Sequence, residues 1–202
     1  MKPIFMTDIE QGEEMWFQEK LGKVSASNAS KLVTNKGVPS KQREDYLYSL
    51  VAEKITGQRV DTFKSEAMEE GNRREQESRE LYQIIYGVEV ERVGLVYMNE
   101  DRNVLCSPDG IVDREYGLEL KNVLPKTQVK YLSKGSLPSQ YFSQLQFSMM
   151  VTGFKYWMFC SYSPGLNPLI LKIERDEKFI ETLQNEIIRF CKDIDILVEK
   201  IG

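Results

Sequence analysis

The chain has 202 residues, of which 41% are hydrophobic and 29% charged, the composition of an ordinary globular protein, and we expect a single domain over residues 1–202. It contains no histidine, which excludes Ser-His-Asp and Cys-His catalysis, His-ligated zinc and HNH-type nuclease chemistry, and its three cysteines are too far apart to ligate zinc or an iron–sulfur cluster. The formal net charge is −4, no apolar run reaches the length of a membrane span and no signal-peptide core is present, so we expect a cytoplasmic protein with no membrane partner.

The first third of the chain is predicted to be helical. Residues 40–55 place Tyr46, Leu47 and Leu50 at helical spacing, and Gly57 follows as a typical helix end. The same reasoning predicts a helix over residues 11–20, another that begins at Ser25 or Ser27, and a longer one that begins at Ser65 and ends at Gly87.

The spacing of apolar residues changes in the middle of the chain. Short β-branched or apolar runs predict strands at residues 88–96, 104–106, 110–112 and 118–123, then a helix over 138–151 and strands at 156–162 and 169–173. Asp176 caps a final amphipathic helix. The expected fold is α/β, with a mixed central β-sheet flanked by helices.

One predicted hairpin carries most of the chemistry, with the sequence SPDGIVD from residue 107 and GLELK from residue 117. Residues two apart in a strand share a face, so Glu119 and Lys121 would enter one site while Leu118 and Leu120 pack behind them. Asp109 and Glu119 are hard oxygen ligands of the kind that Mg²⁺ selects. The structural alternative is the solvated face of an antiparallel strand pair.

Two other segments also have both a functional and a structural interpretation. Residues 21–27 are either a loop with a helix cap or, with Lys20 and Lys23 nearby, a helix N-terminus that can seat a phosphate. Residues 140–146 begin a helix with Phe142 and Leu145 in the core and a polar face whose role the residues alone leave open.

The Pro-Asp-Gly turn followed by Glu-x-Lys resembles the PD-(D/E)XK nuclease superfamily, which implies a restriction-endonuclease-like core. Within it the chain resembles the phage lambda exonuclease branch, the YqaJ-type viral recombinase exonucleases. The resemblance covers six blocks in the same order along the chain, at residues 16–27, 71–75, 106–110, 117–121, 141–149 and 173–178.

This resemblance implies a role for each matching residue of the metal site. Glu75, Asp109 and Glu119 match the carboxylates that bind Mg²⁺, for which Mn²⁺ is expected to substitute, and the backbone carbonyl of Leu120 would complete the shell. Lys121 matches the lysine that orients or activates the attacking water, a role that is easier if burial lowers its pKa. Gln144 matches a glutamine that positions the nucleophile or the lysine. The candidate catalytic residues are therefore Glu75, Asp109, Glu119, Lys121 and Gln144.

The resemblance also implies residues that bind the DNA end. Ser27 matches a serine that holds the terminal 5′-phosphate, and Lys20 stands where the family pattern has an arginine, so the bidentate fork is lost. We therefore expect either a weaker preference for a 5′-phosphorylated end or assistance by Lys23 or Lys36. Met68 is either a wedge in the duplex end or a core methionine, and Tyr141, one turn before Gln144, is a further DNA-binding candidate.

The implied function is Mg²⁺-dependent degradation of linear double-stranded DNA from the 5′ end, releasing mononucleotides and leaving 3′ single-stranded tails. The resemblance further implies a homotrimeric ring, with basic residues such as Lys126, Lys130 and Lys134 in its channel, and a single-strand annealing protein as partner in phage-type recombination in a bacterial host.

Two alternatives have other functions. One is a structure-specific or site-specific endonuclease of the same superfamily, and the other is a catalytically dead DNA-binding accessory protein of recombination. The second is disfavoured because Glu75, Asp109, Glu119 and Lys121 are all present.

Overall fold

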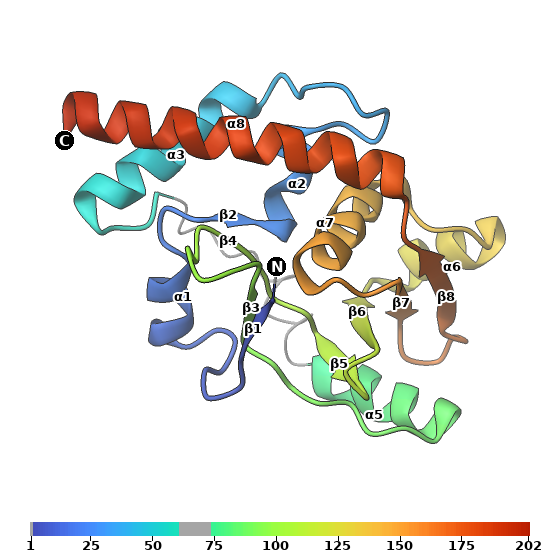
Figure 1. Ribbon diagram of the computed structural model, residues 1–202. Helices are drawn as coiled ribbons and strands as arrows, with labels where there is room; N and C mark the ends of the chain where they lie inside the picture. Colours follow the sequence, from blue (N-terminus) through green and yellow to red (C-terminus); the bar gives the residue numbers. More distant parts are fainter. Residues whose placement is uncertain (1, 61–73) are drawn as a thin grey trace.

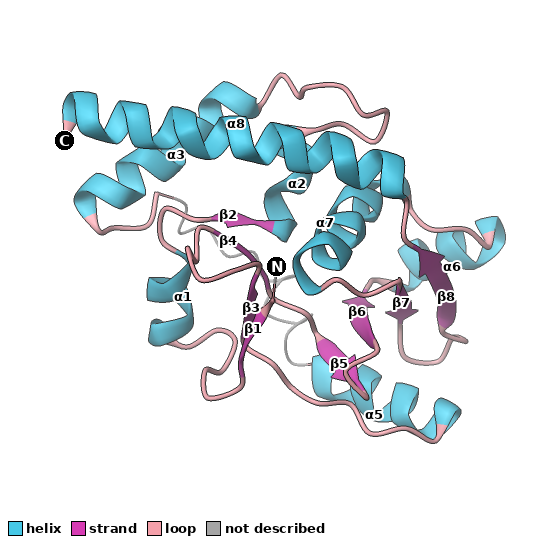
Figure 2. Cartoon of the chain, viewed as in Figure 1, coloured by secondary structure: helices cyan, strands magenta, loops and turns pink. Residues whose placement is uncertain are grey.

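The computed structural model describes residues 2–60 and 74–202, and it places helices on both sides of mixed β-sheets (Figures 1 and 2). The helices are α1 (Glu14–Lys20), α2 (Ala29–Leu32), α3 (Arg43–Thr56), α5 (Glu75–Tyr86), α6 (Pro125–Lys134), α7 (Phe142–Thr152) and α8 (Glu177–Ile201), with short 3₁₀ helices at Ala26–Asn28 and Ser139–Tyr141. The strands are β1 (Ile4–Met6), β2 (Val24–Ser25), β3 (Leu95–Tyr97), β4 (Val104–Cys106), β5 (Gly110–Val112), β6 (Tyr116–Asn122), β7 (Tyr156–Tyr162) and β8 (Leu169–Glu174).

The strands form two hydrogen-bonded ladders of four, in the orders β1-β3-β4-β2 and β5-β6-β7-β8. Each ladder combines parallel and antiparallel pairs, with β6 parallel to β7 and antiparallel to β5. The chain passes from one ladder to the other through residues 107–109, where Pro108 has no N–H to donate. The predicted α/β class with mixed sheets between helices is therefore confirmed.

Strand β6 lies inside its ladder and separates two packed layers. Leu118 and Leu120 belong to a buried cluster with Tyr82 of α5. Trp157 and Phe159, on the neighbouring strand β7, belong to the main core with Phe147 of α7. Figure 1 shows α5 and α7 on opposite sides of this ladder.

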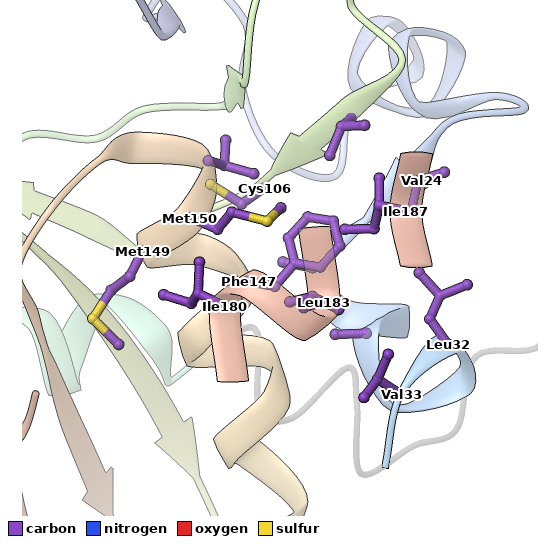
Figure 3. Close-up of a cluster of buried hydrophobic side chains, with 14 of the residues drawn as sticks. Val24, Leu32, Val33, Cys106, Phe147, Met149, Met150, Ile180, Leu183 and Ile187 are labelled. Carbon is purple, nitrogen blue, oxygen red and sulfur yellow. The ribbon is translucent and has the colours of Figure 1, made fainter. Parts of the chain in front are cut away.

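The main core lies between α7, α8 and the segment of α2. Figure 3 shows Phe147, Met149 and Met150 of α7 beside Ile180 and Leu183 of α8. Helix α7 is buried over almost its whole length, and polar residues such as Gln146 and Ser148 are buried together with its apolar ones. Helix α8 is amphipathic, as predicted, and its Asp176 cap accepts a hydrogen bond from the Phe179 N–H.

Three predicted elements differ most in extent from the structure, and one is the helix predicted to begin at Ser25 or Ser27, whose α-helical part, α2, begins only at Ala29 after a 3₁₀ turn. The first helix begins at Glu14 rather than at residue 11, because Gly12 takes a positive φ of 91°. The strand predicted over 88–96 is reduced to Leu95–Tyr97, since the Val90 N–H donates to the side chain of Gln83 at the end of α5. The predicted helix start at Ser65 lies outside the described residues.

Helix α6 has no counterpart among the predicted helices. Its end signals are present, with Pro125 in the first turn and Gly135 as a left-handed C-cap at φ 57°. The helix has only ten residues and directly follows an apolar strand segment, so the helical spacing of its apolar residues extends over too short a stretch to stand out. None of the helices in the described part of the chain has the length and apolarity needed to cross a membrane.

Candidate active site

The strand β6 brings two charged side chains to one point. Glu119 and Lys121 lie on the same face, as their spacing predicts, and Lys121 Nζ is 2.5 Å from Glu119 Oε1. Glu119 is 1% exposed, although it carries a carboxylate. Glu119 therefore does not lie on the solvated face of an antiparallel strand pair, so that alternative is excluded for this residue.

Asp109 reaches the same point from the turn before β5. Its N–H donates to the Leu118 carbonyl at 3.1 Å, and its Oδ2 accepts the Leu120 N–H at 2.7 Å. The same oxygen is 3.8 Å from Lys121 Nζ. Two carboxylates thus share one ammonium group, and the hydrogen bond from the backbone of β6 fixes the direction of the Asp109 carboxylate.

Burial and neighbouring charges set the protonation of this cluster. Burial raises the pKa of Glu119 to about 7, Lys121 opposes this shift and the Asp109 charge adds to it. Burial acts to lower the pKa of Lys121, but Glu119 and Asp109 outweigh it and hold the pKa above its ordinary value. Burial therefore does not give Lys121 a lowered pKa, because two carboxylates accompany the lysine into the site and favour its charged form.

Helix α7 supplies the next layer of the site. Gln144, in its first turn, donates from Nε2 to Glu119 Oε1 at 2.6 Å. The Tyr141 ring lies 5.7 Å from Lys121 Nζ and packs against Phe159 with ring centroids 5.2 Å apart. Gln144 and Tyr141 therefore both lie beside the Glu119–Lys121 pair.

Glu75 is the first residue of α5 and forms an ion pair with Arg79, one turn later. Arg79 is 5% exposed, and its guanidinium also donates to the Asp109 carbonyl at 3.1 Å. Burial and the Asp109 charge raise the pKa of Glu75, while Arg79 opposes them. Arg79 was absent from the sequence prediction, although its i, i+4 spacing from Glu75 is the signal of such a pair.

The oxygen atoms of this site are of the kind that bind a divalent cation. Carboxylate and carbonyl oxygens are the ligands that Mg²⁺ prefers, and the oxygens of Asp109 and Glu119 face a common point beside the Leu120 backbone. Within residues 2–60 and 74–202, no three acidic, Cys or His side chains are placed to hold an ion together, since Glu75 faces Arg79. The chemistry of the site fits a hard cation, because two carboxylates converge on it. Glu75 lies nearby but is paired with Arg79.

A cavity of about 960 Å³ adjoins this site, because Glu75, Gln76 and Arg79 of α5 form part of its wall. The rest of the wall contains the carboxylates of Asp45 and Glu53 but more cations, together with polar groups, among them Lys20, Lys23, Ser25, Asn28, Lys31, Arg59 and Arg92. A hollow with this lining suits an anionic ligand.

Lys20 is held inside this cavity by an aromatic ring. Its Nζ lies 3.7 Å from the centroid of Trp16, whose indole N–H donates to the Gly94 carbonyl at 3.0 Å. Burial lowers the pKa of Lys20 to about 8, and the nearby Arg59 adds to this effect. None of the ion pairs found in the described part of the chain includes Lys20, so this ammonium faces the cavity without a carboxylate bound to it.

The other predicted DNA-end residues are placed less directly. Ser27 is exposed, and its Oγ is 3.3 Å from the Oγ of Ser25, which does line the cavity. Lys23 is already paired with Glu19 at 3.2 Å. Lys36 is exposed and is not among the residues that line the cavity, and Met68 lies outside the described residues. Ser25, which belongs to the predicted phosphate-binding segment, and Asn28, which the sequence prediction omitted, line the cavity, whereas Ser27 does not.

Comparison with known proteins agrees with this geometry. An α/β sheet of this kind, with Asp109 and Glu-x-Lys on a hairpin, defines the restriction-endonuclease-like class, and the structural matches confirm that fold. The family model for the YqaJ-like viral recombinase domain matches residues 15–155, and the chain belongs to this family.

Individual relatives match over different lengths. The alkaline exonuclease LHK-Exo from Laribacter hongkongensis has a TM-score of 0.84 and 28% identity, over 94% of this chain and 96% of its own. A phage-related exonuclease from Haemophilus somnus 129PT has a TM-score of 0.68 at 13% identity, over 89% of this chain and 96% of its own, and shows the fold alone. The putative uncharacterized protein ExoD of Escherichia coli (strain K12) is 32% identical over 72 residues, which is 33% of this chain and 80% of ExoD.

Proposed function

We propose that the protein is a Mg²⁺-dependent exonuclease that degrades one strand of linear double-stranded DNA from its 5′ end. It releases mononucleotides and leaves 3′ single-stranded tails, which suit recombination by single-strand annealing. The observation that carries the proposal is the ammonium of Lys121 between the carboxylates of Glu119 and Asp109. Family membership supports a nuclease role, and LHK-Exo, a named alkaline exonuclease, has been crystallised with dAMP, a mononucleotide.

The side chains of the site divide the work on the scissile phosphate. Lys121 stays protonated and stabilises negative charge that develops on the phosphate. Gln144 holds the Glu119 carboxylate in place, and Arg79 holds the turn that carries Asp109. A divalent cation held by Asp109, Glu119 and the Leu120 carbonyl, with Glu75 nearby, would supply Lewis-acid stabilisation of the phosphate.

The cavity supports the 5′ polarity of the proposal. Lys20 presents a half-buried ammonium that no carboxylate pairs with in the described residues, and a terminal phosphate would neutralise it. Ser25 and Asn28 add hydrogen-bonding groups to the same wall. Since Glu75 and Arg79 also line the cavity, a phosphate bound there lies close to the site of cleavage.

The proposal includes the assembly and the setting of the enzyme. We propose a homotrimeric ring around DNA and an annealing protein as its partner, in the cytoplasm of a bacterial cell with phage or prophage origin. Native mass spectrometry tests the ring, which requires three times the 23.5 kDa of one chain. A mass of one or two chains would contradict it.

The substitution Lys121→Ala tests the catalytic cluster. We expect Mg²⁺-dependent nucleotide release to fall by about 10²–10³-fold, because one preorganised charge is lost, while duplex binding is largely kept. Release of acid-soluble nucleotides from a linear duplex measures the first effect, and fluorescence anisotropy measures the second.

The control for this experiment is Lys155→Ala, which removes an exposed lysine before β7 and leaves the site intact. Activity of Lys121→Ala equal to that of the control would remove the catalytic proposal. Cutting of covalently closed circular DNA by the wild-type protein would favour the endonuclease alternative.

A further inference from the structure

One long segment of this acidic protein contains no acidic residue. The chain has 31 Asp and Glu residues against 27 Lys and Arg, yet residues 120–173 hold six lysines and not one carboxylate side chain. Three of the six, Lys126, Lys130 and Lys134, follow one another at i, i+4 and i+8 on α6. We call these three residues the α6 lysine stripe.

The α6 lysine stripe points away from the protein body. Residues four apart share a helix face, and all three lysines are exposed, whereas Gln128 and Tyr131 of the same helix are buried against the sheet. None of the ion pairs found among residues 2–60 and 74–202 includes a lysine of the stripe. Eight residues of helix separate the first lysine from the last, so the stripe is about 12 Å long.

Helix α6 is fixed against β7, the neighbour of the catalytic strand β6, by a buried polar network. Gln128 Nε2 donates to the carbonyls of Ser161 and Asn167, at 3.1 and 2.9 Å, and the Ser161 hydroxyl donates back to Gln128 Oε1 at 2.9 Å. Ser161 of β7 is the register partner of Lys121 in β6. Figure 1 shows α6 at the edge of the molecule beyond β7 and β8. The stripe therefore lies on a helix held to β7, the strand that pairs with the catalytic strand.

We propose that the α6 lysine stripe binds the phosphate backbone of the duplex DNA on which the enzyme acts. This inference rests on the proposed function and adds a binding surface to it. Single-strand phosphates of B-DNA repeat every 3.4 Å along the helix axis, so a stripe of about 12 Å spans about three or four of them. The exposed apolar residues beside the stripe are Leu124 and Val129, neither of them aromatic, so stacking on unpaired bases has no platform here.

Lysine ammonium groups contact phosphates as point charges and read no base sequence. The stripe therefore supplies affinity without sequence preference. The stripe also explains how an acidic protein can bind DNA, because a protein with a net charge of −4 needs a local cationic surface to hold a polyanion.

The test compares two triple variants with equal loss of positive charge. The stripe variant is Lys126→Gln, Lys130→Gln and Lys134→Gln, and the control variant is Lys178→Gln, Lys192→Gln and Lys200→Gln on the exposed face of α8. Binding of a fluorescein-labelled blunt duplex is measured by anisotropy in EDTA over a series of salt concentrations, so that no DNA is cleaved.

We expect the slope of log K against log salt to become less negative by about 2–3 in the stripe variant, since each lost phosphate contact accounts for about 0.9, and to stay unchanged in the control. Equal slopes in both variants, or a loss confined to single-stranded DNA, would overturn the proposal. The proposed function is tested separately by nucleotide release from the wild-type and control proteins in Mg²⁺, because binding in EDTA requires no catalysis.

Discussion

Residue 20 is a lysine where the sequence resemblance leads us to expect an arginine, and of these two residues only lysine can lose its charge in the usual range of assay pH. Burial against Trp16 lowers the Lys20 pKa to about 8. The ammonium therefore predominates below pH 8, and the neutral amine predominates above it. If this group captures the terminal phosphate, the capture weakens as the pH rises through 8.

The substitution Lys20→Arg tests this argument. The ratio of kcat/KM for 5′-phosphorylated ends to that for 5′-hydroxyl ends should fall up to about tenfold in the wild type between pH 7 and 9, because kcat/KM reports the free enzyme. In Lys20→Arg the ratio should stay constant, since arginine keeps its charge. The same decline in both proteins would show that Lys20 is not the titrating group. Taking a ratio of two substrates cancels pH effects elsewhere in the site.

The residues of the site were predictable to different degrees. Strand periodicity alone places Glu119 and Lys121 together, and the Pro-Asp-Gly turn brings Asp109 to them. Arg79 was missed because its role depends on the fold, which turns the start of α5 toward the Asp109 carbonyl. The net direction of the Lys121 pKa could not be predicted from burial alone, since it depends on the two carboxylates beside the lysine.

At the scale of elements, the glycine before the Glu-x-Lys sequence is required by the neighbouring strand. Gly117 is the register partner of Trp157, and a Cβ atom at Gly117 would lie 2.2 Å from the indole ring. Trp157 is fully buried, so the ring has no room to move away. The close packing of these two residues fixes β6 against β7 at the start of the catalytic strand.

The substitution Gly117→Ala is expected to destabilise the fold by about 1–3 kcal/mol through overpacking. Urea unfolding followed by circular dichroism measures the loss. In a Trp157→Phe background the same change should cost less, because the smaller ring leaves space for the methyl group, and the double-mutant cycle isolates this contact. An equal cost in both backgrounds would assign the effect to strand propensity instead.

Elements with long apolar patterns were predicted well, and short ones were not. The pattern of α8 and the Gly57 end of α3 gave both helices close to their true bounds. Helix α6 was missed because its stability comes from the Gln128 network and from tertiary packing, which leave little trace in the order of apolar residues. Division of the strands into two ladders depends on contacts distant in sequence, which local patterns do not contain.

At the scale of the whole molecule, two cationic features adjoin the carboxylate cluster. One is the cavity that holds Lys20, whose wall includes Glu75 and Arg79, and the other is the α6 lysine stripe beside β7. We propose that the first recognises the DNA end and that the second adds affinity along the duplex. An overall negative charge is compatible with both, because each is a local concentration of cations on an acidic body.

The account depends on a cation-dependent site that consumes DNA from a captured 5′ end. The most direct test is the polarity of degradation on blunt duplexes labelled separately at the 5′ and 3′ termini, with Mg²⁺ and with EDTA. We predict that the 5′ label appears at once as a mononucleotide in Mg²⁺, that the 3′ label stays in long single strands, and that EDTA prevents both reactions. Early release of the 3′ label, or equal release in EDTA, would contradict the account.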